Sequence, residues 1–276
     1  MSVISNLKTR FAWATEKYFN YFTSNPYQDL STDYNDDHVD MDIYTVAFNN
    51  DKTIKNLIKL FAKFVRGTYR IIICDNSTNE DMAQKIQTIC HNNNITYFRL
   101  KQHIKISPSM SHGLALNWIY YNICKARKNN FCFIDHDLLP IKEFNINDFM
   151  HDKFYGLLKE RENGKLWYLW PGYCFFNFDF INSYNNVSFS TCKRCDTGGQ
   201  NYHIIYKNFD KNQINFAKYN EKKILSDENI TKNVDQLCKV EFIDDCWLHT
   251  IAASGWVDIS EKEKIIDKKI EELLNS

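Results

Sequence analysis

The stretch FCFIDHDLLP at residues 131–140 decides the fold and points to the site. Its first four residues are apolar, as in a buried strand, and Asp135 and Asp137 follow directly. Two ionised carboxylates cannot be buried without a partner, so we expect them at the carboxyl end of the strand, facing a ligand or cation. In an extended chain residues i and i+2 point the same way, so the pair should converge while His136 points elsewhere. Carboxylate oxygens suit Mg²⁺ or Mn²⁺, which predicts a metal and diphosphate site; an acidic turn is the alternative.

Strand and helix patterns alternate upstream of this stretch. The expected elements are strands at 42–48, 69–74 and 95–100 and helices at 53–64, 80–90 and 109–128. Such alternation predicts a parallel sheet with right-handed crossovers, in which ligands bind beyond the carboxyl ends of the strands. Asn49 and Asp75 follow the first two of these strands and Asp135 follows the fourth strand at 131–134, so we expect all three at one edge of the sheet.

Four segments in this order resemble the GT-A glycosyltransferases, particularly their family 2-like branch. They are TVAFNN at 45–50, ICDNSTNED at 73–81, GLALN at 113–117 and the Asp135-His136-Asp137 triplet. The resemblance spans about residues 42–140, and Asn76 departs from it where the family usually has glycine. It implies an α/β fold of GT-A (Rossmann-like) type, with a mostly parallel sheet flanked by helices and a mixed acceptor-side half.

The resemblance also implies roles for the nucleotide-binding half. Phe48 and Asn49 would line the nucleotide pocket, and Asp75 would hydrogen-bond the base. Asn117 would lie near the sugar nucleotide. Arg99, Lys101 and Lys105 could assist the diphosphate, although a solvated basic loop is the alternative.

A metal centre follows from the same resemblance. Asp135 would lie near the ribose and the metal, and Asp137 would be a direct metal ligand. His249 stands where many metal-dependent GT-A enzymes return a histidine to the cation, within DDCWLHTIAASGW at 244–256. Imidazole is an acceptable ligand for Mn²⁺, less so for Mg²⁺. A hydrogen-bonded structural histidine is the alternative reading.

The second half is expected to bind the acceptor and complete the catalytic centre. Asp196 stands where related transferases carry their acceptor-side carboxylate, which makes it the first candidate for a catalytic base; an Asp-initiated turn is the alternative. Asp244 and Asp245 are the other candidates. Within the aromatic segment WYLWPGYCFF at 167–176, we expect Trp170 to form an acceptor wall. Cys192 and Cys195 have the spacing of half a zinc knuckle, without a second pair.

Composition limits the remaining possibilities. Lys and Arg together number 34, as do Asp and Glu, so no strong field for nucleic acid is expected. No stretch approaches the ~20 apolar residues that cross a bilayer. Nine cysteines without a signal-peptide pattern predict thiols in a reducing compartment. We therefore expect a cytoplasmic protein, with peripheral membrane association left open.

The expected domain organisation has three parts. A helical arm and acidic connector would occupy residues 1–40, and a single GT-A domain residues 41–258, divided into nucleotide (41–140) and acceptor (141–258) halves. A helix would follow at 259–276, and its apolar face could dock on the domain; a homodimer formed through the terminal helices is the other possibility.

The sequence thus predicts a metal-dependent glycosyltransferase that moves a sugar from a UDP- or GDP-linked donor to a hydroxyl of a saccharide, lipid-linked or protein acceptor, with inversion or retention undecided. One alternative is a nucleotidyltransferase, although residues 49–52 lack its Gly-rich phosphate loop. The other is a degenerate GT-A domain that serves nucleotide-sugar binding or assembly; the intact Asp75, Asp135 and Asp137 count against it.

Overall fold

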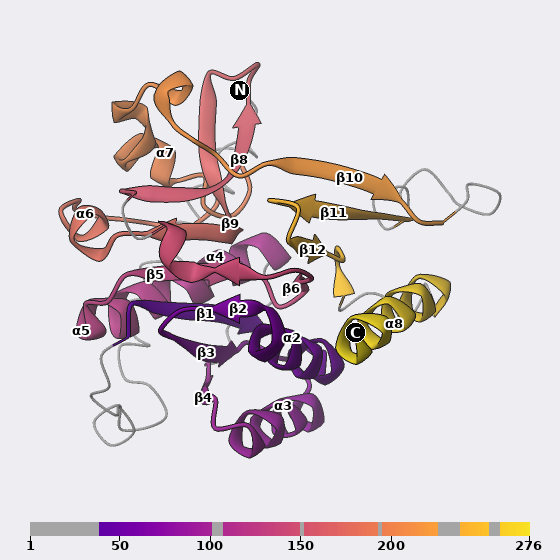
Figure 1. Cartoon of the computed structure of the whole chain (residues 1–276). Helices are drawn as coiled ribbons and strands as arrows, with labels where there is room; N and C mark the ends of the chain where they lie inside the picture. The colour runs from indigo at the N-terminus through magenta and orange to yellow at the C-terminus, as the bar shows by residue number, and fades with distance from the viewer. Residues whose placement is uncertain (1–38, 101–106, 150–151, 193–194, 226–237, 254–259) are drawn as a thin grey trace.

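The computed structural model describes residues 39–100, 107–149, 152–192, 195–225, 238–253 and 260–276. Its centre is a six-stranded sheet of order β4-β3-β1-β5-β9-β8 (Figure 1). The first four strands in this order are parallel, whereas β9 runs antiparallel to both of its neighbours, β5 and β8. The strands are β1 (Met41–Ala47), β3 (Tyr69–Asp75), β4 (Thr96–Arg99), β5 (Phe131–Ile134), β8 (Phe154–Arg161) and β9 (Leu166–Phe176). The predicted α/β class with a mixed second half is confirmed.

Two smaller sheets contain the other strands of the described residues. The first is antiparallel, has the order β10-β11-β12-β6, and consists of β6 (Leu138–Pro140), β10 (Tyr219–Lys223), β11 (Lys239–Ile243) and β12 (Trp247–His249). The second pairs β2 (Val65–Arg66) with β7 (Phe144–Asn145). Because β5 ends at Ile134 and β6 begins at Leu138, the triplet 135–137 is the joint between the central sheet and the antiparallel sheet.

The three helices predicted between residues 41 and 140 are all present. They are α2 (Asp51–Phe64), α3 (Glu80–Asn92) and α4 (Pro108–Ile119), which continues through a π-turn (Tyr120–Cys124) into α5 (Lys125–Arg127). Side chains cap their first turns: Asn50 accepts from the Thr53 amide, and Asn79 from the Met82 amide. Short helical turns occupy the second half, at Ile146–Phe149, α6 (Phe178–Asn182), α7 (Asn201–Ile204), Tyr206–Asn208 and Lys211–Gln213.

Both faces of the parallel strands are buried. Alternate residues of β3 belong to different cores, since Ile71 and Ile73 pack with α2 and α3 while Ile72 and Cys74 pack with α4. This explains why the parallel strands read as continuous apolar runs in the sequence. It also leaves the strand ends as the places where polar side chains can reach a ligand.

The C-terminal helix α8 (Ser260–Asn275) docks on this body beside α2 (Figure 1). Ile266 and Ile270 of its predicted apolar face are buried, and Lys262, also fully buried, donates to the carbonyls of Lys239 and Ile251. The apolar face of α8 is therefore covered by the domain to which the helix belongs. The predicted N-terminal arm lies outside the described residues.

All nine cysteines lie in the described part of the chain and are free thiols. Lys193 and Arg194, between Cys192 and Cys195, are outside that part. Among the residues described, no helix is both long and apolar enough to span a bilayer.

A buried ion pair braces the end of the sheet opposite the strand carboxyl ends. Arg127 donates to Asp42 through Nε at 2.6 Å and Nη2 at 3.1 Å, and Asn129 adds a bond at 3.1 Å. The Asp42 side chain is 1% exposed. Replacing Asp42 with Ala removes the carboxylate and leaves its partner's charge buried, so we expect a loss of about 3–5 kcal/mol in the free energy of unfolding.

Urea unfolding measures this loss. Glu143→Ala is the matched control, because Glu143 pairs with Arg66 at 3.6 Å on the surface, where a pair contributes about 0–1 kcal/mol. Equal effects of the two substitutions would contradict a bracing role for Asp42.

Candidate functional site

The carboxyl ends of β1, β3 and β5 lie side by side, as predicted. The register places Ala47 opposite Asp75, and Asp75 opposite Arg99. Asn49, at φ 47°, ties the first two ends together: its backbone amide donates to Ser77 Oγ at 2.8 Å, and its side-chain oxygen accepts from the amides of Thr78 and Asn79 at 3.0 Å. Asn49 thus braces the loops that surround the expected nucleotide pocket. Its contact with a nucleotide stays a prediction, as does that of Phe48.

The Asp135-His136-Asp137 triplet forms a tight turn rather than the end of a strand. β5 stops at Ile134, and the Leu138 amide donates back to the Asp135 carbonyl at 3.0 Å. His136 folds toward β1, with Nδ1 3.1 Å from the Val46 carbonyl oxygen. The two carboxylates converge, as predicted, but the turn produces this convergence and not the alternation of an extended chain.

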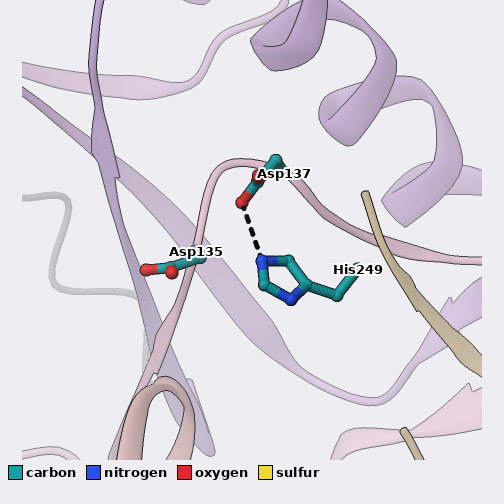
Figure 2. Close-up of side chains that lie close together, drawn as sticks. All are labelled: Asp135, Asp137 and His249. Carbon is teal, nitrogen blue, oxygen red and sulfur yellow. Dashed lines mark ion pairs between the residues drawn. The ribbon is translucent and has the colours of Figure 1, made fainter. Parts of the chain in front are cut away.

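His249 meets this turn from a distant part of the sequence. Strand β12 pairs antiparallel with β6 and brings His249 opposite Leu138. The His249 Nε2 lies 3.4 Å from Asp137 Oδ1, and Figure 2 shows the ring pointing at that carboxylate. One ligand atom each from Asp135, Asp137 and His249 lie within 4.8 Å of one another. Within the described ranges this is the one group of three or more potential metal ligands.

The three potential metal ligands fit a small divalent cation. Around an octahedral ion with ligands at about 2.1 Å, adjacent ligand atoms lie roughly 3 Å apart and opposite ones roughly 4 Å apart. The 3.4 Å between Asp137 Oδ1 and His249 Nε2 is close to the first value, and the 4.8 Å limit within which all three ligand atoms lie is somewhat above the second. Two carboxylates and an imidazole suit Mn²⁺ better than Mg²⁺.

Opposite charges dominate the electrostatics. Burial alone would raise the pKa of Asp137, but the adjacent His249, aided by a hydrogen bond from Ala253, holds that pKa well below its usual range. Burial would lower the pKa of His249, yet the carboxylates of Asp137 and Glu241 outweigh it and raise the pKa to about 10. The imidazole thus lies between two carboxylates that both favour its protonated form.

The segment after His249 holds Asp137 in place. Thr250 donates to the Asp137 carbonyl through its amide at 3.0 Å, and the Ala253 amide donates to Asp137 Oδ2 at 3.2 Å. Asn50, the cap of α2, donates to the Ala253 carbonyl at 3.0 Å. The loop thus links the turn, the start of α2 and β12 into one unit.

Asp75 is fully buried at the end of β3. Its carboxylate accepts from the Ser77 amide and from the Tyr97 hydroxyl, both at 2.8 Å. Arg99 lies at 3.9 Å from the same carboxylate and also pairs with Glu80. Lys101 and Lys105 lie outside the described residues. The role of Asp75 in base recognition stays a prediction.

The GLALN segment makes a close contact that its residues explain. A Cβ at Gly113 would lie 3.0 Å from the Phe189 carbonyl oxygen, so glycine lets α4 approach that segment. One turn later, Asn117 donates to Ser190 Oγ at 2.8 Å and accepts from the Phe189 amide at 2.7 Å. The Asn117 amide is thus committed to the 189–190 segment, and its expected place near the sugar nucleotide stays a prediction.

The candidate bases occupy two different places. Asp196 is exposed, and the neighbouring Thr197 donates to the carbonyl of Ser109 in the first turn of α4 at 2.9 Å. One turn along that helix, His112 Nε2 lies 3.5 Å from Asp135 Oδ1. This chain of contacts leads from Asp196 to the metal-ligand group.

Asp244 and Asp245 form the turn of the β11–β12 hairpin, both with positive φ. The Asp244 carboxylate accepts from the hydroxyls of Tyr155 and Tyr173 and from the Lys218 amide, so it anchors the turn. Asp245 lies four residues before His249, roughly 13 Å along an extended strand.

Sequence reasoning missed Glu241 and His112, and the acceptor-wall role that it gave Trp170 stays a prediction. Glu241 Oε2 lies 2.5 Å from His249 Nδ1, and the Trp170 ring packs on His249 with centroids 4.7 Å apart. Lys159 Nζ lies 5.5 Å from the same indole. A signal for Glu241 existed only in the hairpin register, because Glu241 and His249 are equally distant from Asp245.

No protein family matches the chain, and no curated protein matches it either. Solved structures match part of it, among them S. aureus TarS, with a TM-score of 0.38, 16% identity, and coverage of 56% of this chain and 32% of TarS. A mannosyltransferase from S. cerevisiae matches with a TM-score of 0.38, 10% identity, and coverage of 63% and 66%. A Pyrobaculum calidifontis mannosyltransferase, solved with GDP-Man and Mn²⁺, matches with a TM-score of 0.37, 8% identity, and coverage of 65% and 57%.

Each of these matches covers only part of the fold. The chain spans about a third of the length of TarS and about two thirds of the yeast enzyme.

Proposed function

We propose that this protein is a glycosyltransferase that moves a sugar from a nucleotide diphosphate sugar to a hydroxyl acceptor and depends on a divalent cation. The observation that carries the proposal is the convergence of Asp135, Asp137 and His249 at the carboxyl ends of parallel strands. Ligands of open α/β sheets bind at that edge, and this ligand set suits a cation that also binds phosphate oxygens. The segments that resemble GT-A enzymes surround the same edge.

In this proposal the chain's own residues bind and orient the donor. Asp135, Asp137 and His249 hold the cation, which when bound offsets the charge that develops on the diphosphate leaving group. Asn49 and Asp75 hold the loops on which the nucleotide lies, and Asp75 contacts the base. Asn117, through the 189–190 segment, sets the position of the acceptor side.

Asp196 is our choice for the base of an inverting reaction. Its carboxylate is exposed, as a group that meets an acceptor hydroxyl must be, and its only described acceptor bonds are to Thr197. Asp244 already accepts three hydrogen bonds, which makes it the weaker candidate. The acceptor is a saccharide, a lipid-linked group or a protein, and the cytoplasm is the proposed compartment.

A calorimetric titration with UDP and GDP, each with and without Mn²⁺, tests the proposal. We expect one nucleotide to bind more tightly with Mn²⁺ present. The matching sugar nucleotides then serve as donors in an assay for release of the nucleotide diphosphate with added acceptors. Binding of neither nucleotide would contradict the proposal, and binding without turnover of any donor would favour a nucleotide-sugar-binding module.

Asp75→Ala should weaken nucleotide binding and relax the preference between UDP and GDP. Loss of a buried carboxylate that bonds the base costs about 1–3 kcal/mol, or roughly 5- to 150-fold in the dissociation constant. The same titration measures it. Tyr97→Phe is the control, because it removes the phenol that bonds Asp75 and keeps the carboxylate. If Asp75→Ala keeps the wild-type preference between UDP and GDP, Asp75 only stabilises the turn at 75–77.

A further inference from the structure

We propose that Glu241 is a positioning residue of the cation centre, which fixes the ring of His249 so that Nε2 faces Asp135 and Asp137. The inference rests on the cation centre of the proposed function and adds to it a residue outside the ligand group. Glu241 is not one of the three residues whose potential ligand atoms lie close together. It acts through His249.

The geometry gives the two ring nitrogens different partners. The register of the β11–β12 hairpin sets Glu241 directly opposite His249. Glu241 Oε2 lies 2.5 Å from Nδ1, and Asp137 Oδ1 lies 3.4 Å from Nε2 on the other side of the ring. An ionised carboxylate can only accept a hydrogen bond, so Nδ1 keeps its proton, and Nε2 is the nitrogen that gives up its proton when a cation binds.

Glu241 is itself held in place. The Tyr219 hydroxyl donates to Glu241 Oε1 at 2.8 Å, which leaves Oε2 directed at the imidazole. The side chains of Glu241 and His249 are only 15% and 11% exposed. The Trp170 ring packs on the imidazole and limits its rotation. Ring orientation is therefore set before any cation arrives, which lowers the entropic cost of binding it.

The position of Glu241 distinguishes it from its neighbours on the hairpin. Glu221 is its direct cross-strand partner on β10, yet Glu221 bonds Lys239 at 3.0 Å and is 50% exposed. The two glutamates thus carry the same charge on paired strands, and only Glu241 contacts His249. Glu221 is therefore a matched control.

Mn²⁺ binding, measured by electron paramagnetic resonance without nucleotide, tests the proposal on the full chain. We expect Glu241→Ala to weaken Mn²⁺ binding about 10- to 100-fold, the usual effect of losing the partner of a metal-bound histidine. Glu241→Gln should retain part of the affinity, because its amide oxygen still accepts from Nδ1. Glu221→Ala should bind Mn²⁺ like the wild type.

Thermal melts of the metal-free proteins show whether each variant is folded at the temperature of the binding measurement. If the wild type binds Mn²⁺ and Glu241→Ala binds it equally well, the positioning role is overturned while the cation centre stands. If Glu221→Ala loses as much affinity as Glu241→Ala, the effect is one of general charge and the proposal is also overturned. A wild type that binds no Mn²⁺ would remove the centre and the role of Glu241 together.

Discussion

Asp137→Asn should abolish Mn²⁺-dependent nucleotide binding and lower turnover by on the order of 10³-fold or more. A bound cation contributes several kcal/mol to the stabilisation of the leaving group, and each 1.36 kcal/mol is about tenfold in rate. Asp137 is held firmly in place, because it is buried and contacts both His249 and the Ala253 amide. Nucleotide titrations with and without Mn²⁺, followed by donor turnover, measure the two effects separately.

Asparagine is the informative replacement at this position. It keeps a side-chain oxygen that can accept from the Ala253 amide, so the loop after His249 should stay in place, whereas the negative charge is lost. Asp179→Asn, on the exposed side of α6, makes the same chemical change away from the site and should leave binding and turnover intact. Wild-type-like Mn²⁺ dependence in Asp137→Asn would show that the cation is held elsewhere.

The parallel half of the fold could be predicted closely from the sequence. Its strands are buried on both faces, so β1, β3 and β5 read as apolar runs, and polar residues mark where they end. Helix α2 shows the same agreement in its apolar spacing, which matches the buried face, although it begins at Asp51, two residues before the expected start. These signals are local, and a single sequence carries them.

The candidate site was predictable only in part, because part of it depends on long-range register. Asp135 and Asp137 were found from their spacing, although a turn and not an extended strand brings them together. The neighbourhood of His249 follows from the pairing of β12 with both β6 and β11. No local sequence signal marks Glu241 as the partner of His249. The same strand pairing places Asp244 in the hairpin turn, where it accepts hydrogen bonds from two tyrosines.

The acceptor side offers the second large effect. If Asp196 is the base of an inverting enzyme, Asp196→Asn should keep donor affinity and lower kcat by about 10²–10⁴-fold, the usual contribution of general base catalysis. The amide preserves the shape of the side chain and an oxygen for the Thr197 amide, but it cannot take the proton of the acceptor hydroxyl. The loss should therefore fall on the chemical step alone. Steady-state kinetics with the donor found by titration measure it.

The anomeric configuration of the product, determined by NMR, decides how this result is interpreted. Inversion requires a base on the acceptor side, whereas retention removes the need for one there. Asp245→Asn is the companion variant, because Asp245 lies in the hairpin turn and offers the same carboxylate four residues before His249. If the product is inverted, an active Asp196→Asn beside an inactive Asp245→Asn would transfer the role to the hairpin. Asp196 would then only start its own turn, in which its carboxylate accepts from the Thr197 amide and the Thr197 hydroxyl donates to the first turn of α4.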